Sequence, residues 1–512
     1  MHESRLKKSL LNARVNLVFY FLTLILAFFS RKIFLDSLGA DFLGLIGTLQ
    51  NLLGLLNLAE MGIGAAIGYV LYRPLYESDR NKINEIISVL GYMYRCVGIF
   101  ILIVGVVFSL FLHKIFPETI FETRIIYFAY YSFLTSSLIG YFINYKQTLL
   151  GADQRNYVVT AYFQTANIIK IVIQMLLAHY LGNYYLWVII ELLFGIIYSL
   201  ILNWKIKKVY PWLESEVRLG ASLLKKYPNV IKNTKQLFVH KIGAVVYNQV
   251  SPLIIYSFAS LQTVAYYGNY TLIISKLDGL INNILGSTSA GVGSLIAEGN
   301  KSKILDIYWE LMVIRFWIAS VFIFAIYHLL PPFIVLWIGE EYLLSNTILL
   351  LVLITYFLNI VRGTNEQFLL GYGLFNDIWS PFAEATIMIV VSIIGGKMLG
   401  FEGVLWGSIS STTIIIYVWK PYFLFKKGFK LSVWKYWIPW LKNLILLLSS
   451  FVISKYLLDF LFKDLSFVDS WKDWVVYAFV IVIISSLISF SLYYVGTKGM
   501  RLFVKRLINR SF

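Results

Sequence analysis

Charged side chains recur inside the long apolar segments of this sequence. Four cations lie within or at the ends of such segments and could meet an anionic ligand: Arg31, Lys170, Lys241 and Lys276. A charge at bilayer depth costs about 3 kcal/mol on insertion scales, so each is a candidate functional residue. Arginine and lysine offset the desolvation of an anion through charge-assisted, often bidentate, hydrogen bonds. We therefore expect a cavity with surplus positive charge.

These cations also have structural interpretations. Arg31 ends one apolar segment and Lys241 begins a later one, so either could extend to the membrane surface. Lys276 and Asp278 stand two residues apart and point about 200° away from each other on a helix, so they cannot pair within it. At least one of the two is expected to face a lumen. Arg315, near the inner end of its segment, is expected at the interface.

Three carboxylates are candidates for binding a proton or a cation: Glu60, Asp278 and Glu366. Glu60, in "LAEMGIG", has no cation close to it in the sequence and is the strongest of them. Its alternative is a buried pair with a basic group on a neighbouring helix. Arg362 and Glu366 are spaced four residues apart, which favours a pair that neutralises itself on one helix face.

Neutral polar side chains concentrate in two consecutive apolar segments of the second half. The set includes Asn248, Gln249, Asn282 and Asn283. Such side chains supply donors and acceptors for a polar ligand, so these residues are predicted to line the cavity. The competing interpretation is that these side chains form hydrogen bonds between helices. Each such hydrogen bond contributes ~0.6 kcal/mol in a membrane.

The composition is that of a polytopic membrane protein. Of 512 residues, 59% are hydrophobic and 14% charged, and the mean hydropathy is +0.73. A soluble domain carries roughly 25% charged residues. The single cysteine, Cys96, excludes a disulfide framework and any cysteine-based metal site. No metal site or cofactor is predicted. The basic N-terminus lacks a small-residue cleavage site, so the first apolar segment is expected to stay as a helix.

The apolar segments predict an all-α protein with fourteen transmembrane helices. Each segment is long enough to cross a hydrocarbon core of ~30 Å. The predicted spans are 15–33, 42–72, 86–112, 125–145, 157–179, 185–204, 238–259, 264–297, 307–330, 346–371, 378–396, 402–421, 440–459 and 474–496. With the N-terminus inside, inner segments hold 30 Lys and Arg residues and outer segments hold 7. This asymmetry predicts that both termini are cytoplasmic, and it explains the net charge of +17 without nucleic acid.

An internal repeat relates the two halves of the chain. "QTLLGADQRN" at 147–156 returns as "QFLLGYGLFN" at 367–376, and three further matches keep an offset of 218–223 residues. We expect two parallel lobes of six helices (1–6 and 7–12) with a site at their interface and alternating access. The predicted parts are the N-terminal lobe 1–225, the C-terminal lobe 226–430 and an appendage 431–512. The glycine of Gln-x-Leu-Leu-Gly is expected to end its helix tightly.

The N-terminal segment "FFSRKIFLDSLGADFLGLIGTLQNLLGLLNLAEMGIGAAIGYVLYRPL" resembles the Wzx-type polysaccharide (O-antigen) flippases. These belong to the multidrug/oligosaccharidyl-lipid/polysaccharide exporter superfamily. "LFVHKIGAVV" and "PPFIVLWIGEEY" also fit that pattern. The chain departs from it at "YNQVSPL", where the family often has an Asp-Asn pair, so any ion coupling must use another residue.

The resemblance implies transport of undecaprenyl-diphosphate-linked oligosaccharide from the cytoplasmic to the outer leaflet of the bacterial inner membrane. It also implies a polysaccharide polymerase and a chain-length regulator as partners. Fixed cations would then meet the lipid diphosphate as it crosses a region of low dielectric constant.

Two other functions are open at this point. A drug/cation antiporter of the same superfamily should have a dominant acidic site in its N-terminal half, where Glu60 stands. A membrane enzyme, such as a polymerase or ligase, would need a large outer loop, and none exceeds about seventeen residues. No Ser/His/Asp or metal-ligand constellation is visible, so a non-enzyme is predicted.

Overall fold

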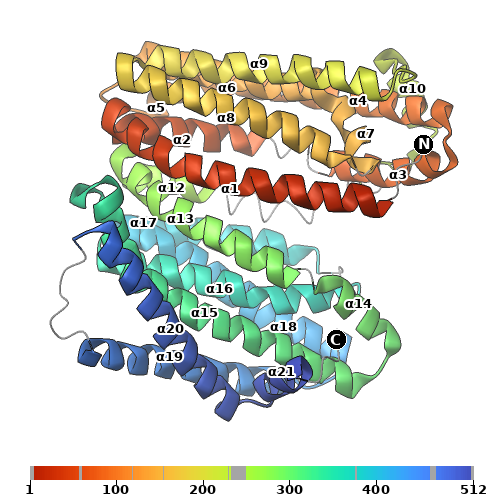
Figure 1. Ribbon diagram of the computed structural model, residues 1–512. Helices are drawn as coiled ribbons and strands as arrows, with labels where there is room; N and C mark the ends of the chain where they lie inside the picture. The colour runs from red at the N-terminus through yellow and green to blue at the C-terminus, as the bar shows by residue number, and fades with distance from the viewer. Residues whose placement is uncertain are drawn as a thin grey trace. The chain divides into compact units, whose positions relative to one another are not determined.

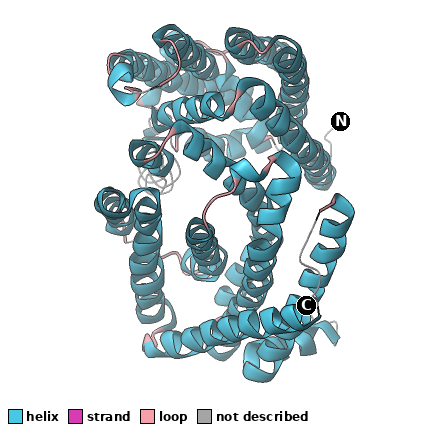
Figure 2. Cartoon of the chain, turned by 90° about the vertical axis from the view of Figure 1, so that its left-hand side faces the viewer, coloured by secondary structure: helices cyan, strands magenta, loops and turns pink. Residues whose placement is uncertain are grey.

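The computed structural model describes the chain apart from residues 1–4, 57–59, 61, 118, 154, 229, 232–233, 235–249, 287, 375–376, 462–468 and 509–512. Within the described residues all regular structure is helical, and no strand occurs (Figure 2). The all-α, multi-span architecture predicted from the sequence is confirmed.

The first half of the chain contains the helices that cover the first six predicted spans. They are α1 (Arg5–Leu38), α2 (Ala40–Leu56), α3 (Ile63–Glu77), α4 (Arg80–Ser109), α5 (Leu112–Ile115), α6 (Thr123–Phe142), α7 (Gln147–Ala152), α8 (Asn156–Leu181), α9 (Tyr184–Val209) and α10 (Gly220–Leu224). The short α12 (Ser251–Phe258) covers the end of the seventh span.

The second half contains helices that range from 4 residues in α18 to 38 residues in α15 (Figure 1). They are α13 (Leu261–Gly286), α14 (Ser289–Glu298), α15 (Lys301–Ile338), α16 (Asn346–Gly371), α17 (Trp379–Thr412), α18 (Lys420–Phe423), α19 (Trp434–Leu461), α20 (Trp471–Gly496) and α21 (Lys498–Ile508). Helix α17 turns at Gly400, which has φ of 60°, and so holds both the eleventh span and the start of the twelfth. Two π-helical stretches, Thr413–Trp419 and Leu424–Phe429, continue the twelfth span.

Ten described segments are long and apolar enough to cross a membrane. One of them, Trp379–Phe429, contains two predicted spans because of the turn at Gly400. The second and eighth spans are each divided between two shorter helices, α2 with α3 and α13 with α14. These divisions account for most of the difference between ten segments and fourteen predicted spans.

The chain separates into two compact units, Met1–Ala265 and Tyr266–Phe512. The predicted division at residues 225 and 430 stays a prediction. In the first unit, α1 packs along α8, and α9 packs against both α6 and α8. Phe42 of α2 stacks on Tyr184 with ring centroids 4.6 Å apart and meets Trp187 edge-on at 5.7 Å, which joins α2 to α9.

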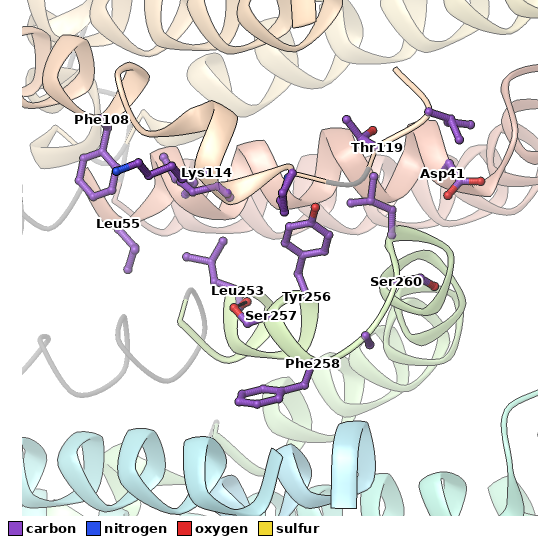
Figure 3. Close-up of a pocket in the computed structure, with 16 residues that line it drawn as sticks. Asp41, Leu55, Phe108, Lys114, Thr119, Leu253, Tyr256, Ser257, Phe258 and Ser260 are labelled. Carbon is purple, nitrogen blue, oxygen red and sulfur yellow. Dashed lines mark hydrogen bonds between the residues drawn. The ribbon is translucent and has the colours of Figure 1, made fainter. Parts of the chain in front are cut away.

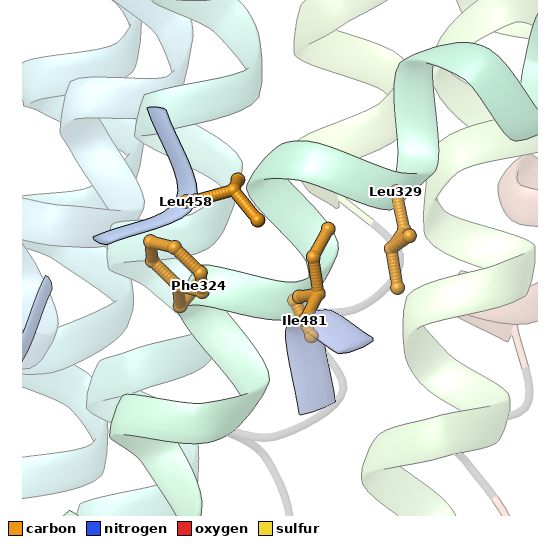
Figure 4. Packing of buried hydrophobic residues seen from close by; sticks show 5 residues of the cluster. Phe324, Leu329, Leu458 and Ile481 are labelled. Atoms are coloured by element: carbon orange, nitrogen blue, oxygen red, sulfur yellow. The ribbon is translucent and has the colours of Figure 1, made fainter. Parts of the chain in front are cut away.

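The second unit is organised around α15, a helix of 38 residues. It packs against α16, α19 and α20. Phe324 and Leu329 of α15 form a buried cluster with Leu458 of α19 and Ile481 of α20 (Figure 4). In a bilayer such contacts act through close van der Waals packing rather than through expulsion of water. The last two long helices, which have no counterpart in the repeat, are therefore attached to α15.

The repeated Gln-x-Leu-Leu-Gly motif packs against the second part of a divided helix in each unit. The first copy is α7, which contacts α3, and the second ends α16, which contacts α14. The predicted tight turn is wrong for both glycines, because Gly151 lies inside α7 and the left-handed residue after α16 is Gly373. A Cβ on Gly371 would lie 2.6 Å from Cδ1 of Ile296, so this glycine permits close packing instead.

Candidate functional site

The interruption between α2 and α3 places a carboxylate among tyrosines. Gly62 begins α3 with φ of 92°, a left-handed conformation that glycine adopts without strain. Glu60, just before it, accepts a hydrogen bond of 2.9 Å from the hydroxyl of Tyr94 on α4. Tyr141 of α6 faces the same carboxylate, and the two tyrosine rings are 5.8 Å apart. Both tyrosines are buried.

No cation of the described part of the chain forms an ion pair with Glu60. Among the described residues, Glu60 therefore does not form the buried salt bridge that was its alternative interpretation. A carboxylate held by hydroxyl donors can bind a proton or a cation with little rearrangement, since a tyrosine hydroxyl can both donate and accept. This arrangement fits the chemistry predicted for Glu60.

Arg31 lies near the end of α1 and is half-buried. Its Nη2 donates a hydrogen bond of 2.9 Å to the carbonyl oxygen of Ala265, in the first turns of α13. The guanidinium of Arg31 thus contacts another helix. It does not only extend to the membrane surface. Its predicted contact with an anionic substrate stays a prediction.

Lys170 is paired with a carboxylate on the neighbouring helix. Its Nζ lies 2.7 Å from Oε1 of Glu191, across α8 and α9. Gln174 donates to the other oxygen of Glu191 at 3.1 Å and to the carbonyl of Trp187 at 3.0 Å. The sequence pattern indicated Lys170 as a cavity cation, but in this structure its charge is balanced by Glu191.

Lys276 and Asp278 are each partly buried on α13. Asp278 lies within electrostatic reach of Arg315 on α15. Arg315 is only 3% exposed, so it is buried within its unit, and its predicted position at the membrane interface stays a prediction. Its Nη1 donates to the carbonyl of Ile360 at 2.9 Å, and the guanidinium occupies space left by Gly363, where a Cβ would lie 2.5 Å from it.

Arg362 connects two carboxylates in the second unit. Its Nε lies 2.6 Å from Oε1 of Glu366, the spacing of four residues predicted for a self-neutralising pair. Its Nη1 lies 3.8 Å from Glu384 of α17. Arg315 and Lys420 also lie within electrostatic reach of Glu366, and the Glu366 side chain is 50% exposed. Glu366 thus remains accessible although it is paired.

Several predicted residues cannot be placed. Lys241, Asn248 and Gln249 lie outside the described residues. Asn282 and Asn283 belong to α13, but their side chains are outside the described part. Their assignment to a cavity stays a prediction.

A cavity of about 920 Å³ lies in the first unit between α2, the segment after α5 and α12 (Figure 3). Such a volume is within the roughly 300–1,000 Å³ of small-molecule sites. Its polar lining consists of Asp41, Lys114, Thr119, Tyr256, Ser257 and Ser260. Asp41 accepts a hydrogen bond of 3.1 Å from Gln262. The hydroxyls and the single ammonium group could bind a polyhydroxyl ligand.

No pattern in the sequence indicates this cavity or the tyrosines around Glu60. No spacing relates Lys114 to the serines of the cavity, Ser257 and Ser260. Tyr94 and Tyr141 lie on two other helices, so no local pattern indicates that they meet Glu60. Among the described residues no group of three or more His, Cys, Asp or Glu side chains could hold a metal ion.

Comparison with known proteins finds similarity in sequence and in fold, although no family model matches the chain. The "Putative O-antigen export protein" of Yersinia pseudotuberculosis is 24% identical over 430 residues, which are 78% of this chain and 92% of that protein. The solved structure of the lipid II flippase MurJ in an inward closed conformation matches with a TM-score of 0.64 and 17% identity, over 93% of this chain and 98% of that one.

An inward-facing multidrug resistance transporter of the MATE family, in the MOP superfamily, matches with a TM-score of 0.56 and 15% identity. The match covers 80% of this chain and 97% of that one. The chain therefore has the fold that these transporters share. The resemblance to polysaccharide flippases predicted from residues 28–75 is confirmed by these similarities.

Proposed function

We propose that this protein is a flippase that moves an undecaprenyl-diphosphate-linked oligosaccharide from the cytoplasmic to the outer leaflet. The observation that carries the proposal is the fold of a lipid II flippase over 93% of the chain, together with a relative described as an O-antigen exporter. The hydroxyl-lined cavity of the first unit supports a cargo that contains sugars.

In this proposal the two six-helix lobes (1–225 and 226–430) alternate access to a central site, and residues 431–512 form an appendage. Arg31 and Lys276 bind the diphosphate, because a doubly charged group needs fixed cations when it leaves water. Lys241 and the polar residues Asn248, Gln249, Asn282 and Asn283 contribute to the same cavity. Glu60 is the coupling carboxylate, and Asp278 and Glu366 are secondary candidates.

The membrane is the bacterial inner membrane, with both termini in the cytoplasm, as the distribution of Lys and Arg predicts. A polysaccharide polymerase and a chain-length regulator are the proposed partners on the receiving side. The protein acts as a transporter and not as an enzyme in this scheme.

A drug/cation antiporter is the second candidate, and one observation favours it. Glu60 lies in the first unit, is held by hydroxyl donors and forms no ion pair within the described residues. This is the type of acidic site that cation exchange requires. The two functions differ in cargo and can be separated by one transport assay.

The test is transport of a labelled undecaprenyl-diphosphate oligosaccharide in proteoliposomes. Wild type is expected to translocate the lipid, and Arg31→Ala and Lys276→Ala are each expected to lower the rate roughly tenfold or more, since a hydrogen bond to a charged group contributes about 1.5–3 kcal/mol. Arg218→Ala and Lys472→Ala, at exposed residues, are the matched controls and should transport like wild type.

Failure of wild type to move the glycolipid, together with exchange of cations against an organic drug, would replace the flippase by the antiporter. Equal rates in all four variants would leave the flippase function but remove Arg31 and Lys276 from its substrate site. Each variant is first checked for normal insertion and yield.

A further inference from the structure

Helices α15, α19, α20 and α21 lie together in the second unit (Figure 1). A small pocket is lined by residues of these helices. Its volume is about 280 Å³, below the roughly 300–1,000 Å³ typical of drug-sized ligands. It is far too small for an oligosaccharide, but it can hold a glycerophosphate group. Nothing in the proposed transport cycle uses this pocket.

The pocket has features that favour an anion, of which the first is a helix N-terminus. Gly496, Thr497, Lys498 and Gly499 form part of its wall, so it includes the N-terminus of α21, an 11-residue helix. Thr497 Oγ1 accepts from the backbone N–H of Met500 at 3.3 Å, the geometry of a helix cap. The first N–H groups and the helix dipole then favour a negative charge at this end.

Lys442 and Lys498 add two ammonium groups to the lining. Lys498 pairs with Asp306 at 2.7 Å, and Asp306 also lines the pocket, so these two charges balance. Lys442 is exposed and forms no ion pair with any other described residue. The net charge around the pocket is therefore positive.

Asn443 provides an independent indication of a ligand. It lines the pocket, is only 2% exposed, and its side chain forms no hydrogen bond within the described part of the chain. Its backbone carbonyl accepts from Tyr493 at 3.0 Å, which fixes the residue in place. A buried amide normally has a partner, so the missing partner is best supplied by a ligand.

The remaining walls indicate that the ligand is a lipid. Val313, Ile438 and Leu502 are apolar, and Ile438 is 66% exposed on the surface of α19. The indole of Trp309 completes the lining, a residue type enriched at membrane interfaces. Helix α21 carries exposed Arg501 and Lys505 beside partly buried apolar residues, the pattern of a helix that lies in the headgroup region.

Helix α21 is fixed to the start of α15, so the pocket is preformed. Arg506 lies 3.1 Å from the buried Glu310, and Met500 is fully buried. Gly499 lets the two backbones approach, because a Cβ there would lie 2.7 Å from the carbonyl oxygen of Trp309. A ligand can bind without ordering the helix first, which lowers the entropic cost of binding.

We propose that this pocket binds the phosphate headgroup of an anionic phospholipid from the leaflet that the C-terminus faces. The phosphate contacts Lys442, Asn443 and the N-terminal amides of α21, and the acyl chains leave along Ile438 and α19. The proposal is independent of the transported cargo.

The test is calorimetric titration of the detergent-purified full-length protein with dioctanoyl phosphatidylglycerol, dioctanoyl phosphatidylcholine and inorganic phosphate. We expect a clear preference for phosphatidylglycerol over both other ligands. Lys442→Ala should raise the Kd about fivefold, in keeping with the contribution of one lysine near an anionic surface. Lys442→Arg should restore most of the affinity, and Lys472→Ala, on an exposed residue of α20, should not change it.

Asn443→Leu, which keeps the side-chain volume but removes the amide, is expected to raise the Kd by a smaller factor. Equal affinity for the two phospholipids, or equal effects of Lys442→Ala and Lys472→Ala, would overturn the proposal. Binding of inorganic phosphate as tightly as phosphatidylglycerol would assign the site to a soluble anion instead of a lipid. None of these results depends on transport activity.

Discussion

The two divided helices of this protein use different chemistry at equivalent places in the repeat. Between α2 and α3, the carboxylate of Glu60 meets tyrosines of α4 and α6. Between α13 and α14, the amide of Gln367 donates to the carbonyl of Leu285 at 2.9 Å and to the hydroxyl of Thr288 at 3.2 Å. One interruption is ionisable and the other is neutral.

The two interruptions therefore share their packing but differ in their chemistry. The motif that contains Gln367 and Gly371 packs on α14 just as its first copy, α7, packs on α3. Only the first unit has a carboxylate at the interruption. We therefore expect substitutions at the interruption between α13 and α14 to affect mainly stability, and substitutions around Glu60 to affect mainly transport.

The largest expected effect is a difference in stability between variants at the two glycines of the repeated motif. Gly371→Leu places atoms against Ile296 of α14 and should destabilise the protein by about 1–3 kcal/mol, as overpacking does. Gly151→Leu should have little effect, because no atom lies within 4 Å of a Cβ there. The apparent unfolding temperature of the detergent-purified variants is the measurement. Equal shifts for both variants would contradict the difference in packing.

Glu60→Gln should lower the transport rate about tenfold. A factor of this size corresponds to a typical coupling free energy between two sites. It should also remove the dependence of transport on the pH gradient, since the amide cannot titrate. Proteoliposome assays at two pH gradients measure both effects. Glu77→Gln, which changes an exposed carboxylate of α3, is the control. A normal rate with normal pH dependence in Glu60→Gln would assign coupling to another residue.

Gln367→Leu should reduce stability by no more than about 1 kcal/mol, because polar contacts between membrane helices contribute ~0.6 kcal/mol each. The substitution also removes Oε1, a buried atom without a hydrogen-bond partner in the described residues. Because this unpaired atom is removed, the loss of stability is smaller. Transport should keep its rate and its pH profile. A change in the pH profile would show that the second interruption shares the function of the first.

Tyr94→Phe should give the smallest effect, a decrease in transport of about threefold, the equivalent of one lost hydrogen bond of ~0.6 kcal/mol. Its control is Tyr456→Phe, because Tyr456 is 76% exposed on α19. Transport in proteoliposomes is measured for both. A loss as large as that of Glu60→Gln would mean that the tyrosine itself carries the proton or cation.

Much of the fold could be predicted from the sequence because hydropathy and repeat spacing report directly on helices. Most described residues of the predicted spans lie on helices, and the offset of 220 aligns Gln147 with Gln367 in motifs that pack alike. The pair of Arg362 and Glu366 was predictable because residues four apart share a helix face.

The environment of single charges could not be predicted in the same way. Lys170 meets Glu191 across two helices, and Arg315 is buried because Gly363 on another helix leaves room for it. Such contacts depend on the rotation of each helix about its axis, which hydropathy does not specify. The carboxylate of Glu60 was identified as a candidate, but its tyrosine partners required the packed structure.

The turn at Gly400 has a consequence for how the chain enters the bilayer during synthesis. Gly395 and Gly403 face each other so closely that a Cβ on either would overlap the carbonyl of the other, and the left-handed Gly400 joins their helices. The polar chain between the eleventh and twelfth spans that must cross the hydrocarbon core is then short and carries Lys397 and Glu402. We expect the two spans to insert together as one helical hairpin, and an epitope placed in this turn to block that insertion.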